Sequence, residues 1–208
     1  MLIKTYRVYL AFRDKIVSSL NWRWGRFIMK THGVSFGKDL MIQGDLEIKT
    51  GNHINFTIGD SCTIKSGRGL NPLSRNIKGS MSVEDGAVLI IGNNCGFSSV
   101  CVWSHQSIII GNNVNIGADS ILMDSDAHSL SYLDRRIVNV DIRNKVNKPI
   151  VIDDDVLIGT RCIILKGVHI GARSIIGSGS IVVNDIPEDS IAAGNPAKVI
   201  RKINQKLT

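Results

Sequence analysis

The sequence predicts an all-β solenoid, a parallel β-helix, on two observations. Aliphatic residues recur at every sixth position near the C-terminus, a period that fits neither an amphipathic strand nor an α-helix. Glycine directly follows three of them, so the chain can turn a corner where a side chain would clash. Short strands between such corners stack about 4.8 Å above the coil below. The series comprises Ile152, Ile158, Ile164, Ile170, Ile176 and Val182, with Gly159, Gly171 and Gly177.

Residues 1–32 are expected to form a separate, basic amphipathic helix. Apolar side chains recur there near helical spacing. The segment contains seven basic residues and one acidic residue, so it holds six of the chain's seven net positive charges. Arg7 and Arg13 interrupt the apolar run and no small-residue cleavage site follows. Neither a signal peptide nor a membrane span is therefore expected, and a cytoplasmic location is predicted.

Two interpretations of this helix stay open. Trp22 and Trp24 stand beside Arg23 and Arg26, which fits a helix that lies on a membrane surface. Residues 1–30 would then hold the protein at the inner face of the membrane. Packing against its own domain or a sister subunit is the other interpretation. Nucleic acid is not expected as a partner, because the main domain lacks a spread of cations and stacking aromatics.

Residues 33–186 are expected to form the solenoid, since the six-residue series continues upstream at Ile110, Ile116 and Leu122. The four cysteines lack the spacing of a redox or zinc motif, and each follows a repeat residue by four positions. They are therefore expected to be reduced side chains in the small interior position of each coil. They are Cys62, Cys95, Cys101 and Cys162.

The repeat is interrupted twice. Residues 66–80 indicate an irregular loop, which either bypasses the solenoid or contacts an anion. The second break begins at His128, where the six-step series from Ile110 would next land, and predicts a loop over residues 129–149. Loops of this length in compact domains are usually functional or disordered. Apolar residues within it predict an ordered arm.

The segment Asp124-Ser-Asp-Ala-His128 resembles the Asp-x-His segment of hexapeptide-repeat sugar O-acetyltransferases, and Ala193-Gly-Asn-Pro-Ala-Lys198 resembles their closing tail. The resemblance extends over residues 36–203 and includes the maltose and galactoside acetyltransferases. It implies a left-handed β-helix, a homotrimer, and a C-terminal capping tail over residues 187–208 with a short helix. It also implies acetyl-CoA as co-substrate.

The same resemblance assigns roles to individual residues. His128 is the expected general base, with Asp126, Asp124 or a backbone carbonyl fixing its tautomer. Backbone amides near Gly159 and Thr160 are candidates for stabilising an oxyanion. The expected coenzyme A contacts are Gly159, Thr160, Ser178, Val183, Asn184, Lys198 and Arg201. The expected acceptor contacts are Asp124, His105 and Gln106.

The predicted function is acetyl transfer from acetyl-CoA to a sugar hydroxyl in the biosynthesis of capsule, O-antigen or exopolysaccharide. Gln106 stands where the galactoside and maltose enzymes have an acidic residue, and Leu157 where many relatives have Trp, so those acceptors are not carried over. N-acetylation of a nucleotide-linked amino sugar and a non-catalytic trimeric scaffold are the alternatives. No metal is expected, because the histidines lack the spacing of a γ-class carbonic anhydrase site.

Overall fold

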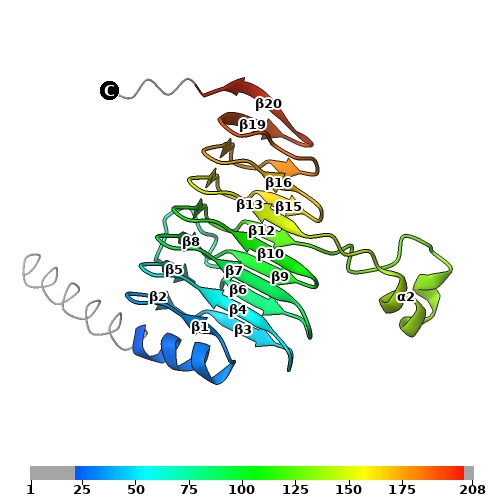
Figure 1. Ribbon diagram of the computed structural model, residues 1–208, viewed down its shortest axis with the longest axis horizontal. Helices are drawn as coiled ribbons and strands as arrows, with labels where there is room; N and C mark the ends of the chain where they lie inside the picture. Colours follow the sequence, from blue (N-terminus) through cyan, green and yellow to red (C-terminus); the bar gives the residue numbers. More distant parts are fainter. Residues whose placement is uncertain (1–21, 204–208) are drawn as a thin grey trace, which may run out of the picture.

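The computed structural model describes residues 22–203, whose strands coil into a three-sided solenoid (Figure 1). Sheet A contains β1 (Ser35–Phe36), β4 (Asn55–Ile58), β7 (Val88–Ile91), β10 (Ser107–Ile110), β13 (Ile150–Ile152) and β16 (His169–Ile170). Sheet B contains β2 (Met41–Gly44), β5 (Thr63–Ser66), β8 (Gly96–Ser98), β11 (Asn115–Ile116), β14 (Leu157–Ile158), β17 (Ile175–Ile176), β19 (Ser190–Gly194) and β20 (Ala197–Lys202). Sheet C contains β3 (Glu47–Thr50), β6 (Ser80–Val83), β9 (Cys101–Ser104), β12 (Ile121–Met123), β15 (Ile163–Leu165) and β18 (Ile181–Val182).

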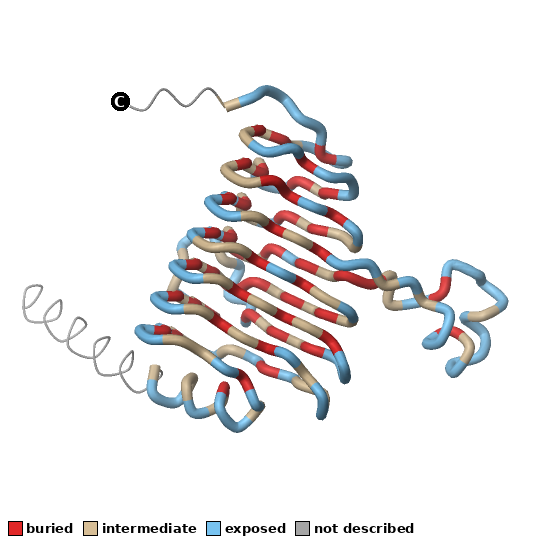
Figure 2. The backbone as a smooth tube through the Cα atoms, viewed as in Figure 1, coloured by how far each residue is buried: buried red, intermediate tan, exposed pale blue. Residues whose placement is uncertain are grey.

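The core is a set of columns of side chains inside the coils. Each coil places one strand in each sheet, and successive coils pair in parallel and in register. Leu89, Ile108 and Ile150 are aligned in this way and are fully buried. Buried residues alternate with half-buried or exposed ones along the strands (Figure 2). The six-residue period of the sequence is therefore the length of one side of the solenoid, and the predicted β-helix is confirmed.

Three of the four cysteines lie in the interior, and one does not. Cys62, Cys95 and Cys162 are buried, whereas Cys101 is only half-buried on β9. Ile116 pairs with Phe97 and Leu122 pairs with Val102. The earlier corner is thus one residue shorter, which places Val102 inward and turns Cys101 outward. The expectation that Cys101 fills an interior position was wrong for this reason.

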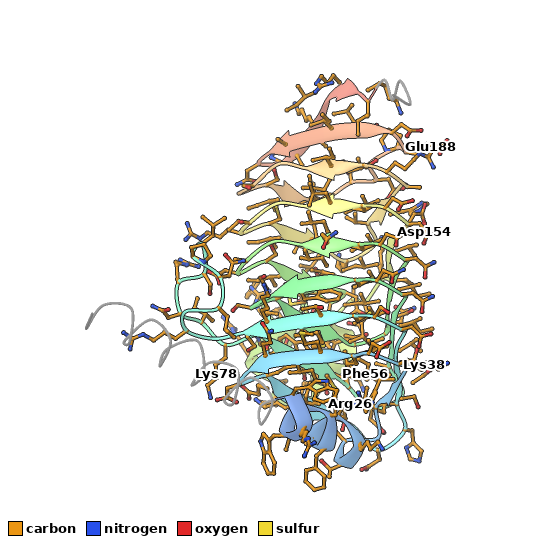
Figure 3. All side chains as sticks on the ribbon, turned by 90° about the vertical axis from the view of Figure 1, so that its left-hand side faces the viewer. Arg26, Lys38, Phe56, Lys78, Asp154 and Glu188 are labelled. Atoms are coloured by element: carbon orange, nitrogen blue, oxygen red, sulfur yellow. The ribbon has the colours of Figure 1, made fainter. Side chains whose placement is uncertain are left out.

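The first interruption is a loop over residues 67–79 that stands at the corner between sheets B and C. The carboxylate of Asp119 holds it there, because it accepts hydrogen bonds from the Ser74 hydroxyl at 3.0 Å and the Arg75 backbone N–H at 2.9 Å. The Asp119 side chain is 2% exposed. In the view from the side, this loop projects from the solenoid near Lys78 (Figure 3). Its attachment by a buried carboxylate fixes the loop in place at this corner.

The second interruption leaves sheet C after β12 and returns to sheet A at β13. It contains the 3-10 turn η1 (Asp134–Arg136) and the helix α2 (Val138–Asn144), and it extends away from the solenoid as an arm (Figure 1). Ser125 and Asn147 form an antiparallel bridge at its base. We call residues 124–149 the arm.

The two ends of the described chain differ from each other. Residues 22–31 are helical and lie beneath the first coil, while the rest of the expected N-terminal helix lies outside the described residues. At the other end, β19 pairs in parallel with β17, and β20 folds back antiparallel on β19. A hairpin therefore stands where a short C-terminal helix was expected, through residue 203. No helix within residues 22–203 is long and apolar enough to cross a membrane.

Candidate active site

His128 lies in the arm just beyond its base. The Asp126 N–H donates to the Val146 carbonyl at 3.0 Å, and the Lys148 N–H donates to the Asp124 carbonyl at 2.9 Å, so the two sides of the arm are paired where it leaves the solenoid. Ala127 then has a left-handed φ of 62°, a sharp change of direction that few L-residues adopt. This turn presents His128 at the side of the arm, where its side chain is 69% exposed.

The imidazole of His128 is held by Asp141 from helix α2. The Asp141 Oδ2 atom lies 2.6 Å from His128 Nδ1, and its Oδ1 atom accepts the Ser129 N–H at 2.7 Å. The hydrogen bond from His128 and the one from the Ser129 N–H lower the pKa of Asp141. A carboxylate at this position fixes the proton on Nδ1 and leaves the lone pair of Nε2 available. The arrangement is that of a general base with a buried orienting carboxylate.

Asp126 was expected to orient His128, and the structure gives it another partner. Its Oδ1 atom forms an ion pair with Lys166 Nζ at 3.2 Å, and its Oδ2 atom is buried without a hydrogen-bond partner within residues 22–203. The expected orienting role therefore falls to Asp141. Sequence reasoning missed Asp141, because it stands 13 positions from His128 and only the folding of the arm brings the two together.

Asp124 was expected to contact the acceptor, but it is fully buried and structural. Its carboxylate accepts the backbone N–H groups of residues 105, 106 and 107 at 2.6, 2.8 and 2.7 Å. Asp85 accepts backbone N–H groups of residues 52 and 53 at the same corner two coils lower. A carboxylate at this corner replaces backbone partners where the chain turns from sheet C to sheet A.

The other two expected acceptor residues lie on the coil beneath the arm. His105 Nδ1 lies 2.9 Å from Lys145 Nζ, and because an ammonium group can only donate, the neutral ring carries its proton on Nε2. Burial, followed by the charge of Lys145, lowers the pKa of His105. Its Nε2 atom is buried with no partner among residues 22–203. Gln106 is exposed beside it.

Three of the expected coenzyme A residues line one cavity on the outer face of sheet B. Gly159, Thr160 and Ser178 border a volume of about 410 Å³ together with Lys65 and Leu157. A side chain at Gly159 would come within 2.6 Å of the Ser178 backbone nitrogen, so glycine is needed for this close approach. The Gly159 N–H donates to the Ile176 carbonyl at 2.8 Å. The Gly159 N–H is therefore not free to stabilise an oxyanion, which is the role the sequence suggested for it.

The remaining expected coenzyme A residues are divided between two places. Lys198 and Arg201 lie on β20 at the end of sheet B, and both are exposed. Val183 and Asn184 follow the C-terminal end of β18, whereas the cavity borders the N-terminal ends of the sheet C strands. The structure thus brings together a strip of sheet B from the cavity to β20, and it leaves Val183 and Asn184 outside this strip.

Within one chain, His128 lies at the C-terminal ends of the sheet C strands and the cavity lies at their N-terminal ends. The arm follows the last residue of β12, whereas Gly159 and Thr160 precede the first residue of β15, its neighbour in the sheet. Strands β12 and β15 therefore separate the base from the cavity. Among residues 22–203, no three His, Cys, Asp or Glu side chains are placed to hold a metal ion.

Comparison with known proteins shows what kind of solenoid this is. Residues 149–184 match the family "Bacterial transferase hexapeptide (six repeats)", and residues 107–123 match the "Hexapeptide repeat of succinyl-transferase". The repeats and the fold together define a left-handed β-helix of the hexapeptide type. The resemblance to hexapeptide-repeat acyltransferases that the sequence indicated is confirmed.

Particular relatives narrow the comparison. A candidate acetyltransferase of Schizosaccharomyces pombe is 38% identical over 125 residues, which are 60% of this chain and 55% of that protein. The chain thus spans little more than half the length of that relative. The crystal structure of a hexapeptide-repeat acetyltransferase of Vibrio cholerae matches 99% of this chain and 94% of its own, with 25% identity and a TM-score of 0.58. The polySia-specific acetyltransferase NeuO matches 84% of this chain and 83% of its own, with 25% identity and a TM-score of 0.50.

Proposed function

We propose that this protein is an acetyl-CoA-dependent O-acetyltransferase that acts on a sugar hydroxyl in surface polysaccharide biosynthesis, with His128 as general base. The observation that carries the proposal is the pairing of His128 with Asp141 at 2.6 Å. It produces an exposed imidazole with one fixed tautomer on a hexapeptide β-helix. The acetyltransferase relatives in yeast and Vibrio support the reaction class, and the polySia-specific relative supports a sugar polymer as acceptor.

In this mechanism the Nε2 atom of His128 accepts the proton of the acceptor hydroxyl as its oxygen forms a bond to the thioester carbonyl carbon. The imidazolium that results is stabilised by the Asp141 carboxylate, which stays ionised because its pKa is lowered. The imidazolium then returns the proton to the departing sulfur. No acyl-enzyme intermediate is needed, and such a base contributes about 10² to 10⁴ in rate.

The strip of sheet B is the proposed binding place for acetyl-CoA, which supplies the activated acetyl group as a thioester. Gly159, Thr160 and Ser178 border a cavity of about 410 Å³ that we propose takes the narrow pantetheine arm. Lys198 and Arg201 stand further along the same sheet, where their positive charges fit the phosphates. Val183 and Asn184 remain proposed contacts only through a second copy of the chain, because they lie outside this strip.

A homotrimer is part of the proposal, since one chain keeps His128 and the cavity at opposite ends of sheet C. A neighbouring copy can place its cavity against the arm. Co-expression of a His128→Ala chain with a Thr160→Trp chain tests this, because the bulky indole is expected to fill the cavity. Mixed oligomers are expected to recover activity that each variant lacks alone. No recovery from stably associated chains would place the complete site within one subunit.

The reaction itself is tested with acetyl-CoA and a panel of sugars that carry hydroxyl groups alone or amino groups as well. O-acetyl products are esters that mild base removes, whereas N-acetyl products are stable amides. Base-labile acetylation of polysaccharide precursors is the expected result. Acetylation of amino groups alone would select the alternative, an N-acetyltransferase on a nucleotide-linked amino sugar.

A further inference from the structure

The N-terminal end of the solenoid exposes two aromatic side chains on the outer face of its capping helix. Trp24 is 63% exposed and Phe27 is 55% exposed. Their rings stack with centroids 5.6 Å apart, so they form one continuous apolar surface. Exposed aromatics next to each other mark an interaction surface more often than isolated ones do.

The opposite face of this helix is already used for packing against the first coil. Met29 is fully buried, and the Trp22 indole N–H donates to the Leu40 carbonyl at 2.6 Å. At Gly25 a side chain would come within 2.8 Å of Ile42, so the helix is pressed closely against β2. Trp24 and Phe27 therefore cannot turn inward by a rotation of the helix without disrupting this packing.

Two positively charged side chains flank the aromatic pair on the outer face of the helix. Arg23 and Lys30 are exposed on the same face of the helix. Residues 1–32 hold six of the seven net positive charges of the chain, so the remainder is almost neutral. A membrane with anionic headgroups carries the negative charge that complements this basic, aromatic face.

We propose that the outer face of the helix, formed by Arg23, Trp24, Phe27 and Lys30, docks on the surface of an anionic lipid bilayer. Aromatic rings at the depth of the headgroups with Lys and Arg beside them are the chemistry of an interfacial helix. This inference is independent of the proposed reaction. The arm leaves the fourth coil, which at about 4.8 Å for each coil lies roughly 15 Å further from the membrane than the first coil. If the membrane docking and the proposed reaction both hold, the acceptor would be a sugar displayed on a lipid.

Co-sedimentation of the full chain with vesicles tests the inference. Vesicles of phosphatidylglycerol and phosphatidylcholine are compared with vesicles of phosphatidylcholine alone. We expect binding only to the anionic vesicles, and at least a tenfold loss of partitioning in Trp24→Ser/Phe27→Ser. Partitioning of Arg23→Gln/Lys30→Gln onto the anionic vesicles is expected to fall about fivefold for each charge removed. The matched control is Val199→Ser/Ile200→Ser, which removes two exposed apolar side chains at the far end of the solenoid and is expected to bind as the wild type does.

Other occupants of this face would give different results, and each would overturn the inference. Equal vesicle binding by the wild type and Trp24→Ser/Phe27→Ser would exclude the aromatic pair from the contact. A change of oligomeric state in that variant, without vesicle binding by the wild type, would assign the face to a second copy. A melting temperature lowered by several degrees would mean that the chain's own residues cover the rings. Acetyl-CoA binding measured on the same samples separates all of these results from a failure of the proposed reaction.

Discussion

Replacing Asp141 with asparagine changes how the imidazole of His128 is held while keeping the size of the side chain. The asparagine Oδ1 atom can still accept the Ser129 N–H, which the carboxylate accepts at 2.7 Å. Its amide NH₂ group then faces His128 Nδ1. Because that group donates, Nδ1 becomes an acceptor and the imidazole proton moves to Nε2. The ring can no longer accept a proton from the substrate.

The expected cost follows from the role of the lost interaction. General-base catalysis contributes about 10² to 10⁴ in rate, and asparagine in place of an orienting carboxylate removes most of such a contribution. We therefore expect kcat to fall by about 10² to 10⁴, which is about 2.7 to 5.4 kcal/mol in the activation barrier. The KM for acetyl-CoA is expected to stay unchanged, since Asp141 is not among the residues that line the sheet B cavity. Release of the coenzyme A thiol, followed with a thiol reagent, measures both constants.

The matched control is Asp134→Asn on the same arm. Asp134 accepts hydrogen bonds from the Ser129 hydroxyl and the Asn144 amide, both at 2.8 Å, whereas the His128 ring is hydrogen-bonded to Asp141. This variant is expected to keep most of the wild-type kcat. If Asp141→Asn were as active as Asp134→Asn, the assignment of Asp141 as the positioning residue of His128 would be refuted.

Three further predictions concern stability, coenzyme binding and pH. Asp124→Ala leaves three backbone N–H groups without their acceptor. It is expected to lower the free energy of unfolding by about 3 kcal/mol, roughly 1 kcal/mol for each lost hydrogen bond, as measured by urea denaturation. An unchanged midpoint of denaturation would contradict the structural role of Asp124. Lys198→Ala/Arg201→Ala is expected to raise the KM for acetyl-CoA about tenfold with kcat unchanged, and an unchanged KM would remove β20 from the binding strip. The pKa of Asp141 lies below its ordinary value of 3.8, so its pairing stabilises the fold above about pH 4 and is lost as the pH falls through the lowered pKa. Melting temperatures of the wild type and Asp141→Asn should therefore converge only in strong acid, and convergence already at pH 6 would show that the carboxylate is not stabilised by His128.

The fold could be predicted because each coil repeats the same local requirement. An inward aliphatic residue at every sixth position, such as Ile158 and Ile164, sets the length of one side of the solenoid. The strands of the next coil pair with these strands in the same register. The prediction for Cys101 failed where that period changed. Removing one position from the corner between β8 and β9 turns every later side chain of that strand to the other face.

The candidate site could be predicted only in part. His128 was proposed because it stands where the repeat stops, in a segment that resembles the family's Asp-x-His motif. Gly159, Thr160 and Ser178 were proposed from the alignment of the repeats with that family. Asp141 was missed because its contact depends on how an irregular arm folds back. A short helix was expected within residues 187–208, and through residue 203 the chain forms the hairpin of β19 and β20 instead. The six-residue repeat ends before this hairpin, so no periodic signal describes the last coil.

The most direct test of the central claim is calorimetry with acetyl-CoA on the wild type and His128→Ala, together with turnover on the acceptor that the sugar panel identifies. Because His128 is an exposed residue of the arm, its replacement should leave both the fold and the sheet B strip intact. We expect both proteins to bind acetyl-CoA with similar affinity and only the wild type to transfer the acetyl group. A folded wild type that binds no acetyl-CoA at millimolar concentration would rule out the proposed acetyltransferase and favour a non-catalytic scaffold. Full turnover by His128→Ala would show that another group is the base.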